Sequence, residues 1–448
     1  MSHIIVVGAG ISGLAAATFL QRRGHTVEVL ERADVAGGNV RTTRERGYTL
    51  DHAANGWLNS EPAMGRLLEL IGLADATISA SDNYSTRWIF AEGALHPAPM
   101  SPNALLKSQL IPWGAKLRLL LEPLIGRGPA GQTVGEFVRR RLGPAFVDRM
   151  VGPMVAGIYA ADPDALSLDA AFPRMAELER DYRSLFLAML ALRRGGTPRG
   201  HLETLPSGAG AISEALVETL DGSVRCGVDV QAVEARHGGW VVHDEAGARP
   251  CDAVVLACPA HAQARLVRGV ATDAASALDA IPYAPASVVV AGWADGAFAR
   301  PPRGFGVLMA RDATIEGAEG VLGTVFSSSV FPDQAPEGHH LSRTILGGAI
   351  HPEVAALDEQ RLLHRTRGAL QAFLGPMGGE FDLVRIFRHP KGIPQYARGH
   401  RGRVAKVRAA QARHRGLIFA GNHLEGIGVK DCARAGEAAA DAVDAALG

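Results

Sequence analysis

The fold is decided by a strand that runs directly into a glycine turn, Ile4-Ile5-Val6-Val7-Gly8-Ala9-Gly10-Ile11-Ser12-Gly13. The apolar residues predict a strand buried on both faces, and Leu14 to Leu20 predicts the helix that follows it. A second predicted strand, Thr26 to Leu30, ends at Glu31. This strand–turn–helix–strand setting with a terminal acid is the one in which G-x-G-x-x-G binds a dinucleotide.

Each glycine of the turn has a predicted role. Gly8 permits the tight turn, Gly10 lets a pyrophosphate approach the backbone, and Gly13 lets the helix pack on the strand. The helix N-terminus faces the phosphates, and Glu31 accepts hydrogen bonds from the adenosine ribose. The alternative is a plain glycine turn in an α/β sheet, which needs neither the acid nor this context.

A second glycine turn separates FAD from NAD as the predicted cofactor. Glu31-Arg32 is soon followed by Ala36-Gly37-Gly38-Asn39-Val40-Arg41-Thr42. A simple nicotinamide dehydrogenase does not need this turn. It resembles the second phosphate-side contact of the flavoprotein group that includes amine oxidases and phytoene desaturases. The resemblance implies FAD, with a ligand-free Gly-Gly turn as the alternative.

The composition excludes several classes of protein. The 448 residues contain 46 basic and 46 acidic side chains, so no broad basic field is available for nucleic acid. Glycine is abundant, at 53 residues, but has no Gly-X-Y period. The few cysteines form no C-x-x-C pair, and the histidines no metal-ligand motif, so neither a disulfide scaffold nor a metal site is expected. The start, Met1-Ser2-His3, does not resemble a secretory signal and predicts a cytoplasmic, reducing location.

The remaining strands of the parallel sheet are predicted far along the chain. They are Ser223 to Val233, Cys251 to Pro259 and Leu417 to Gly421, while Trp240 to His243 is predicted as a hairpin strand and Lys430 to Leu447 as the closing helix. The predicted fold is therefore α/β and α+β, with a Rossmann-like FAD-binding domain in three pieces, 1–80, 200–284 and 401–448. A mainly helical insertion (81–199) opens with a hairpin at Arg87 to His96. A second, strand-rich insertion (285–400) is the predicted substrate-binding domain, a mixed sheet.

One segment of the helical insertion has the composition of a membrane-surface helix. Leu105 to Ile125 combines leucines and Trp113 with Lys107, Lys116 and Arg118. Docking on a membrane and packing on the protein itself both remain open. No apolar stretch reaches the roughly 20 residues that a transmembrane helix requires.

Several segments together resemble the oxygen-dependent protoporphyrinogen oxidase family over nearly the whole chain. They are, in chain order, Gly157 to Pro163, Ile281 to Pro285, Gly304 to Leu308, Phe331-Pro332-Asp333, Ile393 to His400 and Gly421 to Cys432. The resemblance implies an enzyme that oxidises a porphyrinogen to a porphyrin, with FAD as hydride acceptor and O₂ as the oxidant that yields H₂O₂. Protoporphyrinogen IX and coproporphyrinogen III both remain open as substrates. A homodimer, peripheral membrane association and hand-over to a ferrochelatase-type enzyme are expectations from the family alone.

The resemblance also assigns residues. For the cofactor it adds Ile11, Ser12, Arg32, Gly37, Gly38, Asn39, Val40, Val230, Ala257, Gly421, Asn422, Gly426, Ile427, Gly428 and Val429 to the glycine turn and Glu31. Backbone N–H groups of Gly426 to Val429 are expected to face the flavin. For the substrate it implies a propionate anchor at Arg87 and a cavity lined by Asn55, Gly157, Leu308, Val325 and Ile345. No residue is assigned as a catalytic base.

The chain departs from the family pattern at three places. An acid-x-Gly-Pro-Asn turn is replaced by Asp51-His52-Ala53-Ala54-Asn55, His423 stands where Tyr is frequent, and Ile345 replaces an aromatic residue. Two other functions stay in view. An amine oxidase commonly has a lysine near the flavin, whereas Pro285 to Val288 contains none. A non-catalytic flavin or tetrapyrrole carrier is the alternative of another class.

Overall fold

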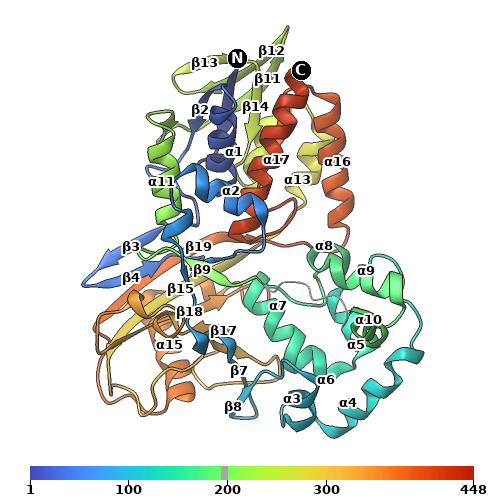
Figure 1. Cartoon of the computed structure of the whole chain (residues 1–448), viewed down its shortest axis with the longest axis vertical. Coiled ribbons are helices and arrows are strands. Elements are labelled where there is room, and N and C mark those ends of the chain that lie inside the picture. The colour runs from blue at the N-terminus through green and yellow to red at the C-terminus, as the bar shows by residue number, and fades with distance from the viewer. Residues whose placement is uncertain (193–199) are drawn as a thin grey trace.

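A five-stranded parallel sheet forms the upper part of the molecule in Figure 1, in a computed structural model that describes residues 1–192 and 200–448. Its strand order is β10-β2-β1-β14-β20. The strands are β1 (His3–Val7), β2 (Thr26–Leu30), β10 (Val224–Arg225), β14 (Ala253–Leu256) and β20 (Leu417–Phe419). Segments more than 400 residues apart thus meet in one sheet, and both chain termini lie at its upper end (Figure 1).

Both faces of this sheet are covered, which explains why β1 is apolar at every inward position. Ile4 and Val6 pack on one side against α1 (Ile11–Arg22) and α17 (Val429–Leu447). On that side also lie α2 (Pro62–Leu70) and α11 (Ala211–Thr219). The opposite face, with Ile5 and Val7, is covered by α12 (Ala260–Val267), α13 (Thr272–Asp279), α16 (His400–Arg413) and the antiparallel sheet β11 (Ala232–Arg236), β12 (Gly239–Asp244), β13 (Gly247–Cys251).

A seven-stranded mixed sheet forms the lower left of Figure 1, with the order β19-β15-β18-β17-β16-β7-β8. Its strands are β15 (Tyr283–Ala294), β16 (Gly306–Met309), β17 (Val321–Val325), β18 (His339–Gly347), β19 (Leu383–Pro394), β7 (Arg87–Ala91) and β8 (Ala94–Pro97). Helix α15 (Glu359–Leu374) packs on one face. The hairpin β3 (Thr42–Glu45) and β4 (Tyr48–Asp51) covers part of the other through Tyr48 and Leu50.

The predicted hairpin at Arg87 to His96 exists, but it does not belong to the helical insertion in space. Strand β7 pairs in parallel with β16, so β7 and β8 complete the edge of the mixed sheet. Local pattern identified the two strands but not their partner, which lies more than 200 residues away. Strands β5 (Trp57–Leu58), β9 (Leu202–Thr204) and β6 (Ile78–Ser79) form a further small sheet.

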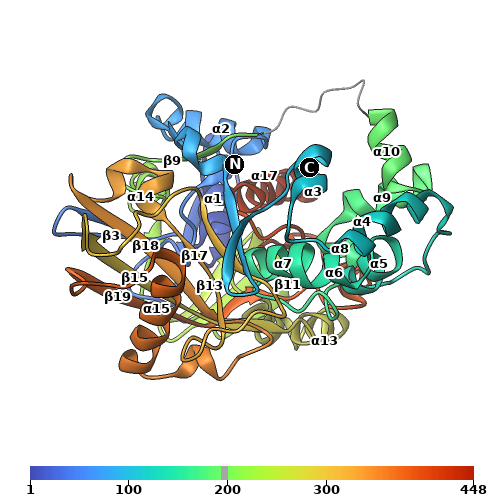
Figure 2. The ribbon, with the colours of Figure 1, turned by 90° about the horizontal axis from the view of Figure 1, so that it is seen from below.

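The helical insertion lies opposite the mixed sheet, as Figure 2 shows from below. Its helices are α3 (Pro102–Lys107), α4 (Trp113–Arg118), α5 (Val134–Arg141), α6 (Pro144–Phe146), α7 (Gly152–Tyr159), α8 (Leu168–Ala171), α9 (Pro173–Tyr182) and α10 (Leu185–Leu192). Within the segment Leu105 to Ile125, α4 is followed by a 3-10 segment, Leu119–Leu124. The last seven residues of the predicted insertion, 193–199, lie outside the described residues.

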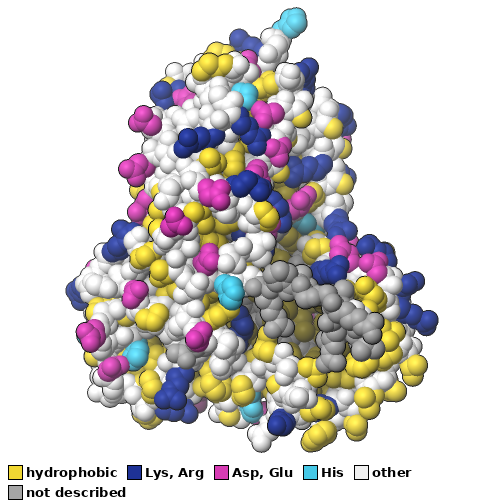
Figure 3. All heavy atoms as spheres, in the orientation of Figure 1, with side chains coloured by type: hydrophobic (Ala, Val, Ile, Leu, Met, Phe, Trp, Pro, Cys, Tyr) yellow, Lys and Arg dark blue, Asp and Glu magenta, His cyan; other side chains and the backbone are white. Residues whose placement is uncertain are grey.

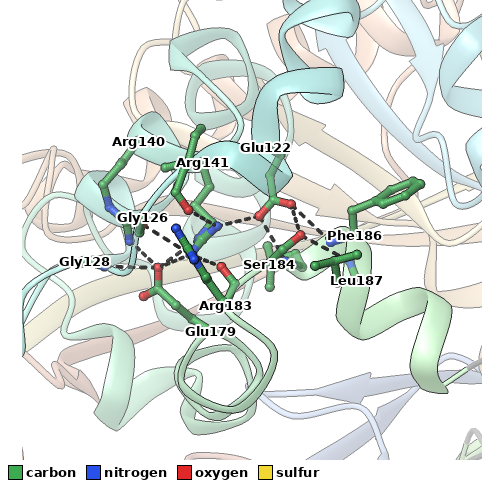
Figure 4. Close-up of polar contacts among 12 residues, drawn as sticks. Glu122, Gly126, Gly128, Arg140, Arg141, Glu179, Arg183, Ser184, Phe186 and Leu187 are labelled. Carbon is green, nitrogen blue, oxygen red and sulfur yellow. Dashed lines mark hydrogen bonds and ion pairs between the residues drawn. The ribbon is translucent and has the colours of Figure 1, made fainter.

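A buried ionic cluster holds the insertion together (Figure 4). The guanidinium of Arg141 donates to Glu122 at 2.7 Å and to Glu179 at 2.8 Å, and also to the carbonyl of Arg183 at 2.6 Å. Glu122 accepts further bonds from the Ser184 hydroxyl and the Leu185 N–H. These hydrogen bonds hold the pKa of both glutamates below the usual range although burial alone would raise it.

Candidate active site

The first glycine turn has the geometry that its sequence predicts. Gly8 has φ +106°, a conformation in which side chains are strained. A Cβ on Gly13 would lie 1.9 Å from the Gly8 carbonyl oxygen, so helix α1 packs on the turn itself. A Cβ on Gly10 would meet nothing within 4 Å, because this glycine faces open space. Glu31 lies at the end of β2 and accepts the Ala9 N–H at 2.8 Å.

The second glycine turn leans on the first. The Gly37 N–H donates to the Ala9 carbonyl at 2.7 Å, and Gly10 and Gly37 form an isolated parallel bridge. Both Gly37 and Gly38 have positive φ, +107° and +57°. A Cβ on Gly38 would come within 3.3 Å of the Gly10 Cα. The two turns, Gly8 to Gly13 and Gly37-Gly38, therefore form the two walls of one groove, here called the trough.

Two cavities continue this trough. A cavity of about 200 Å³ lies at the carboxyl ends of β1, β2 and β14 and is lined by Gly8, Gly10, Glu31, Arg32 and Val230, among others. A larger one of about 490 Å³, here called the main cavity, begins beside it, and Gly38, Ala257, Cys258 and Pro259 line both. A ligand position at the carboxyl ends of parallel strands agrees with the general rule for open α/β sheets.

Of the residues predicted to hold the cofactor, all but Gly13 and Gly426 line these two cavities. The main cavity has Ile11, Ser12, Gly37, Gly38, Asn39, Val40, Ala257, Gly421, Asn422, Ile427, Gly428 and Val429 in its wall. Gly426 lines an adjoining cavity of about 1070 Å³ between α17 and the helical insertion, which shares Ile427, Gly428 and Val429 with the main cavity. A Cβ on Gly426 would lie 2.5 Å from the Asp431 carboxyl carbon, so this glycine makes room for Asp431.

The turn before α17 differs in one respect from its expected geometry. The Gly428 N–H, expected to be free toward the flavin, donates to the Asp431 carboxylate at 3.1 Å. The next N–H groups, at Val429 and Lys430, lie in the first turn of the helix and have no intrahelical acceptor. The donors available to a ligand at this end are thus those of the helix, and Asp431 orders the turn that precedes them.

The residues predicted to bind the substrate lie around the main cavity, some in its wall and some behind it. Asn55, Gly157, Val325 and Ile345 line it. Leu308 stands behind Gly157, where a Cβ would lie 2.6 Å from a Leu308 methyl group. Arg87 is at the rim, with its guanidinium 5.2 Å from the ring centre of Phe305, which is a wall residue.

The wall of the main cavity contains no aspartate or glutamate among the described residues, but it does contain Arg343 and Lys391. Its histidines are neutral, because burial lowers the pKa of His423 to about 3 and also lowers that of His389. Burial raises the pKa of the Cys258 thiol to about 12, so the sulfur stays protonated. The fixed charges in the wall are therefore positive, which suits an anionic ligand.

The sequence pattern did not identify the cations Arg343 and Lys391. Arg343 lies in the insertion predicted to be strand-rich and precedes Ile345 by two residues, so strand alternation places both side chains on one face. The spacing of Arg343 and Ile345 in the sequence could therefore have indicated that Arg343 faces the substrate cavity. Lys391 stands on β19, a strand that the sequence did not indicate. A lysine therefore does line the main cavity, so the absence of lysine from Pro285 to Val288 does not by itself exclude an amine oxidase.

Unpartnered buried atoms show that the main cavity fits polar ligands. Both ring nitrogens of His423, beside the predicted flavin contact Asn422, are buried without a hydrogen-bond partner, so a group such as FAD fits here. The amide nitrogen of Asn55 and Nε of Arg343 are also buried without a partner, but Asn55 belongs to the predicted substrate residues and Arg343 shares a strand face with another of them, Ile345. The open face of Gly10 and the acid at Glu31 accommodate the pyrophosphate and ribose of a dinucleotide.

Comparison with known proteins gives a consistent result. Residues 11–444 match the family described as flavin containing amine oxidoreductase. Coproporphyrinogen III oxidase of Propionibacterium freudenreichii subsp. freudenreichii is 33% identical, over 99% of this chain and 91% of the relative. Protoporphyrinogen oxidase 2 of Arabidopsis thaliana is 29% identical, over 98% and 93%. A crystal structure from Exiguobacterium sp. 255-15, provisionally named a protoporphyrinogen oxidase, superposes with a TM-score of 0.86 at 24% identity, over 99% of this chain and 98% of that one.

Proposed function

Since the chain belongs to the family of flavin-containing amine oxidoreductases, we propose that it oxidises a porphyrinogen to a porphyrin. The protein is a flavin-dependent oxidoreductase, and FAD is its cofactor. The observation that supports this substrate is the wall of the main cavity, which is largely apolar, carries two cations and has no carboxylate in the described residues. A porphyrinogen is a large apolar ring with carboxylates on its edge, so the two surfaces are complementary.

The residues of the trough would hold FAD along its length. Glu31 would bind the ribose, while the glycine turns and the N-terminus of α1 would hold the pyrophosphate. Gly421, Asn422 and the start of α17 would contact the flavin. Bound FAD supplies an acceptor for two electrons in each of three oxidation cycles, and O₂ then regenerates it with release of H₂O₂.

The substrate would lie over the mixed sheet, with Asn55, Gly157, Val325 and Ile345 against the ring and Leu308 supporting Gly157. Arg87 would hold a propionate and orient the ring. Burial lowers the pKa of His423 to about 3 and raises that of Cys258 to about 12, away from the neutral range that general-base catalysis requires. The protein would therefore position the ring, and a substrate proton would leave to water.

Anaerobic bleaching of the flavin tests the proposal directly. Coproporphyrinogen III and protoporphyrinogen IX are each mixed with the holoenzyme, and loss of flavin absorbance is followed before O₂ is admitted. Porphyrin fluorescence is expected only after O₂ is admitted, because one flavin accepts two electrons and the porphyrin forms after six have been removed. Bleaching by alkylamines or benzylamine, with none by either porphyrinogen, would identify an amine oxidase instead. No bleaching by any donor would favour the non-catalytic carrier.

Arg87→Ala tests the anchor separately. We expect kcat/KM for the porphyrinogen to fall by about tenfold or more, because a charged hydrogen bond to a carboxylate is lost. Arg303→Ala, at a nearby exposed position, is the control. An unchanged kcat/KM in Arg87→Ala would remove Arg87 from the substrate site.

We also propose that the helical insertion docks on a membrane surface. Leu106, Trp113, Leu117, Leu120, Leu121 and Leu124 are between 55% and 77% exposed. Figure 3 shows hydrophobic side chains gathered at the lower right, over this insertion. So large an exposed apolar area is unusual for a protein surface in water. No helix in the described residues is long and apolar enough to span a bilayer.

Flotation with liposomes tests the docking. The double substitution Leu120→Asp and Leu124→Asp is expected to abolish the flotation. A wild-type protein that stays at the bottom of the gradient would contradict the docking.

A further inference from the structure

Arg343 is a buried cation whose hydrogen-bonding capacity is largely unused. Its side chain on β18 is 4% exposed and lines the main cavity. One terminal nitrogen donates to the Ala53 carbonyl at 2.5 Å, and Nε has no partner. A guanidinium has five N–H donors in a planar fork, and burying it without acceptors costs several kcal/mol.

The nearest acid does not fill this need. Asp51 is buried close enough to attract Arg343, but no carboxylate in the described part of the chain lies within 4 Å of the guanidinium. The oxygens of Asp51 accept instead from the Thr42 hydroxyl at 2.6 Å, the Ala209 N–H at 3.0 Å and the Gln334 amide at 3.0 Å. Arg343 is thus placed by a carbonyl and left open toward the cavity.

A second donor faces the same space. The amide nitrogen of Asn55 is buried without a partner and lines the main cavity two residues after Ala53. Two unpartnered donors, one of them charged, call for an acceptor. Because the described wall contains no carboxylate, that acceptor has to come with the ligand. A carboxylate matches the planar fork of an arginine best.

The sheet register relates Arg343 to the rim arginine. Arg87 is opposite Gly306, Gly306 is opposite Val325, and Val325 is opposite Arg343. Residues directly opposite on neighbouring strands project from one face, so the two arginines share the face that floors the cavity. Three inter-strand steps of about 4.8 Å separate their backbones by roughly 14 Å. Only Gly306 and Val325 stand between them in this row.

We propose that Arg343 and the amide of Asn55 form a carboxylate-binding subsite, which takes a propionate on the edge of the macrocycle opposite the one held at Arg87. The inference rests on the proposed function. It adds to that function a preference for coproporphyrinogen III over protoporphyrinogen IX. Coproporphyrinogen III has propionates on all four pyrroles, whereas those of protoporphyrinogen IX are confined to two neighbouring pyrroles. A ring with carboxylates on opposite edges satisfies both arginines at once.

The test compares Arg343→Gln with the wild-type holoenzyme in binding and in turnover. Dissociation constants for coproporphyrin III and protoporphyrin IX are measured by fluorescence titration, and KM and kcat for the two porphyrinogens separately. We expect Arg343→Gln to weaken coproporphyrin III binding and raise its KM by about tenfold or more, with kcat little changed. For the protoporphyrin pair the change is expected to stay below about threefold.

A control is Arg388→Gln on β19, which is separated from β18 by β15. Arg388 also donates to a backbone carbonyl, that of Ala355 at 3.2 Å, but it does not line the cavity. Its substitution is expected to leave all four constants unchanged. Equal losses for both substrates in Arg343→Gln overturn the opposite-edge assignment, and unchanged coproporphyrin III binding overturns the subsite.

The ligand can be varied instead of the protein, which covers the case that Arg343→Gln does not fold. The wild type is titrated with coproporphyrin III and with its tetramethyl ester, and about tenfold weaker binding of the ester is expected. An ester that binds as tightly as the acid overturns the subsite. Failure of the proposed function looks different: no porphyrinogen bleaches the wild-type flavin, whatever the binding constants are.

Discussion

In the helical insertion Arg141 is surrounded by acceptors, whereas in the main cavity Arg343 has one. Arg141 is fully buried and donates to two glutamates and to the carbonyls of Arg183, Ile125 and Gly126. Arg343 is almost as deeply buried, yet in the part of the chain that the structure describes only the Ala53 carbonyl accepts from it. The first arrangement is complete without a ligand, and the second is not. A buried arginine whose donors have acceptors in the protein is therefore structural, whereas a buried arginine with unpartnered donors is suited to bind a ligand.

The largest effect is expected from breaking the saturated cluster. Arg141→Met leaves the Glu122 carboxylate buried without its counter-charge and leaves Glu179 paired with Arg140 alone, so the free energy of unfolding should fall by about 3–5 kcal/mol. Thermal unfolding of the holoenzyme measures it. Arg174→Met, which breaks an exposed pair with Glu177, is the control and should cost about 0–1 kcal/mol. If the two variants melt together, the cluster does not stabilise the insertion.

The next test compares two glycines of the cofactor turn. Gly13 is required for the packing of the protein itself, whereas Gly10 is required for the approach of the ligand. Gly13→Ala drives a methyl group into the Gly8 carbonyl, and overpacking of this kind costs about 1–3 kcal/mol even without FAD. Gly10→Ala meets nothing in the protein. Its apoprotein should be as stable as the wild type within about 0.5 kcal/mol, while FAD affinity falls by about tenfold or more.

Melting temperatures of the apoproteins and FAD titrations separate the two roles. A Gly10→Ala apoprotein that melts as early as Gly13→Ala would show that Gly10 is needed for the fold itself. Unchanged FAD affinity in Gly10→Ala would contradict a pyrophosphate at this turn.

The contrast between the two regions also explains what the sequence could reveal. The turn Gly8 to Gly13 and Glu31 form one continuous motif, so their spacing predicted their geometry. Arg343 is positioned by the carbonyl of Ala53, nearly 300 residues earlier, and by the register of the four strands β18, β17, β16 and β7, which no local pattern encodes. Likewise β7 was predicted as a strand, but its pairing with β16 was not. The fold class was predictable, whereas the charges that distinguish substrates depend on long-range pairing.

A third prediction concerns His423, which is fully buried with both ring nitrogens unpartnered. Burial lowers its pKa to about 3 in the folded protein, against about 6.5 in the unfolded chain. The unfolded chain therefore binds the proton first, and stability is lost as pH falls below about 6.5. Between pH 7 and pH 5 this one residue should contribute a loss of about 2 kcal/mol.

His423→Phe removes that proton and should flatten the pH dependence of the melting temperature over this range. Some acid sensitivity should remain, because burial also lowers the pKa of His52 and of His400 to about 4. His237→Asn, at an exposed turn, is the control and should melt like the wild type at every pH. An equally steep pH dependence in His423→Phe would mean that His423 is not the group that titrates.

The smallest effect is expected at the helix starts, where the same contrast recurs. Helix α5 of the insertion has a capping box, in which Thr133 accepts the Glu136 N–H at 3.2 Å and Glu136 accepts the Thr133 N–H at 2.8 Å. Helix α1 begins after Gly10 and has no side-chain cap, so its first N–H groups remain available at the cofactor trough. Thr133→Ala should cost about 1 kcal/mol of stability, and Thr133→Ser, which keeps the hydroxyl, much less. Equal losses of stability in Thr133→Ala and Thr133→Ser would assign the effect to the lost methyl group instead of the hydroxyl. A side-chain cap would then not distinguish the start of a structural helix such as α5 from that of α1, which is left open for a phosphate.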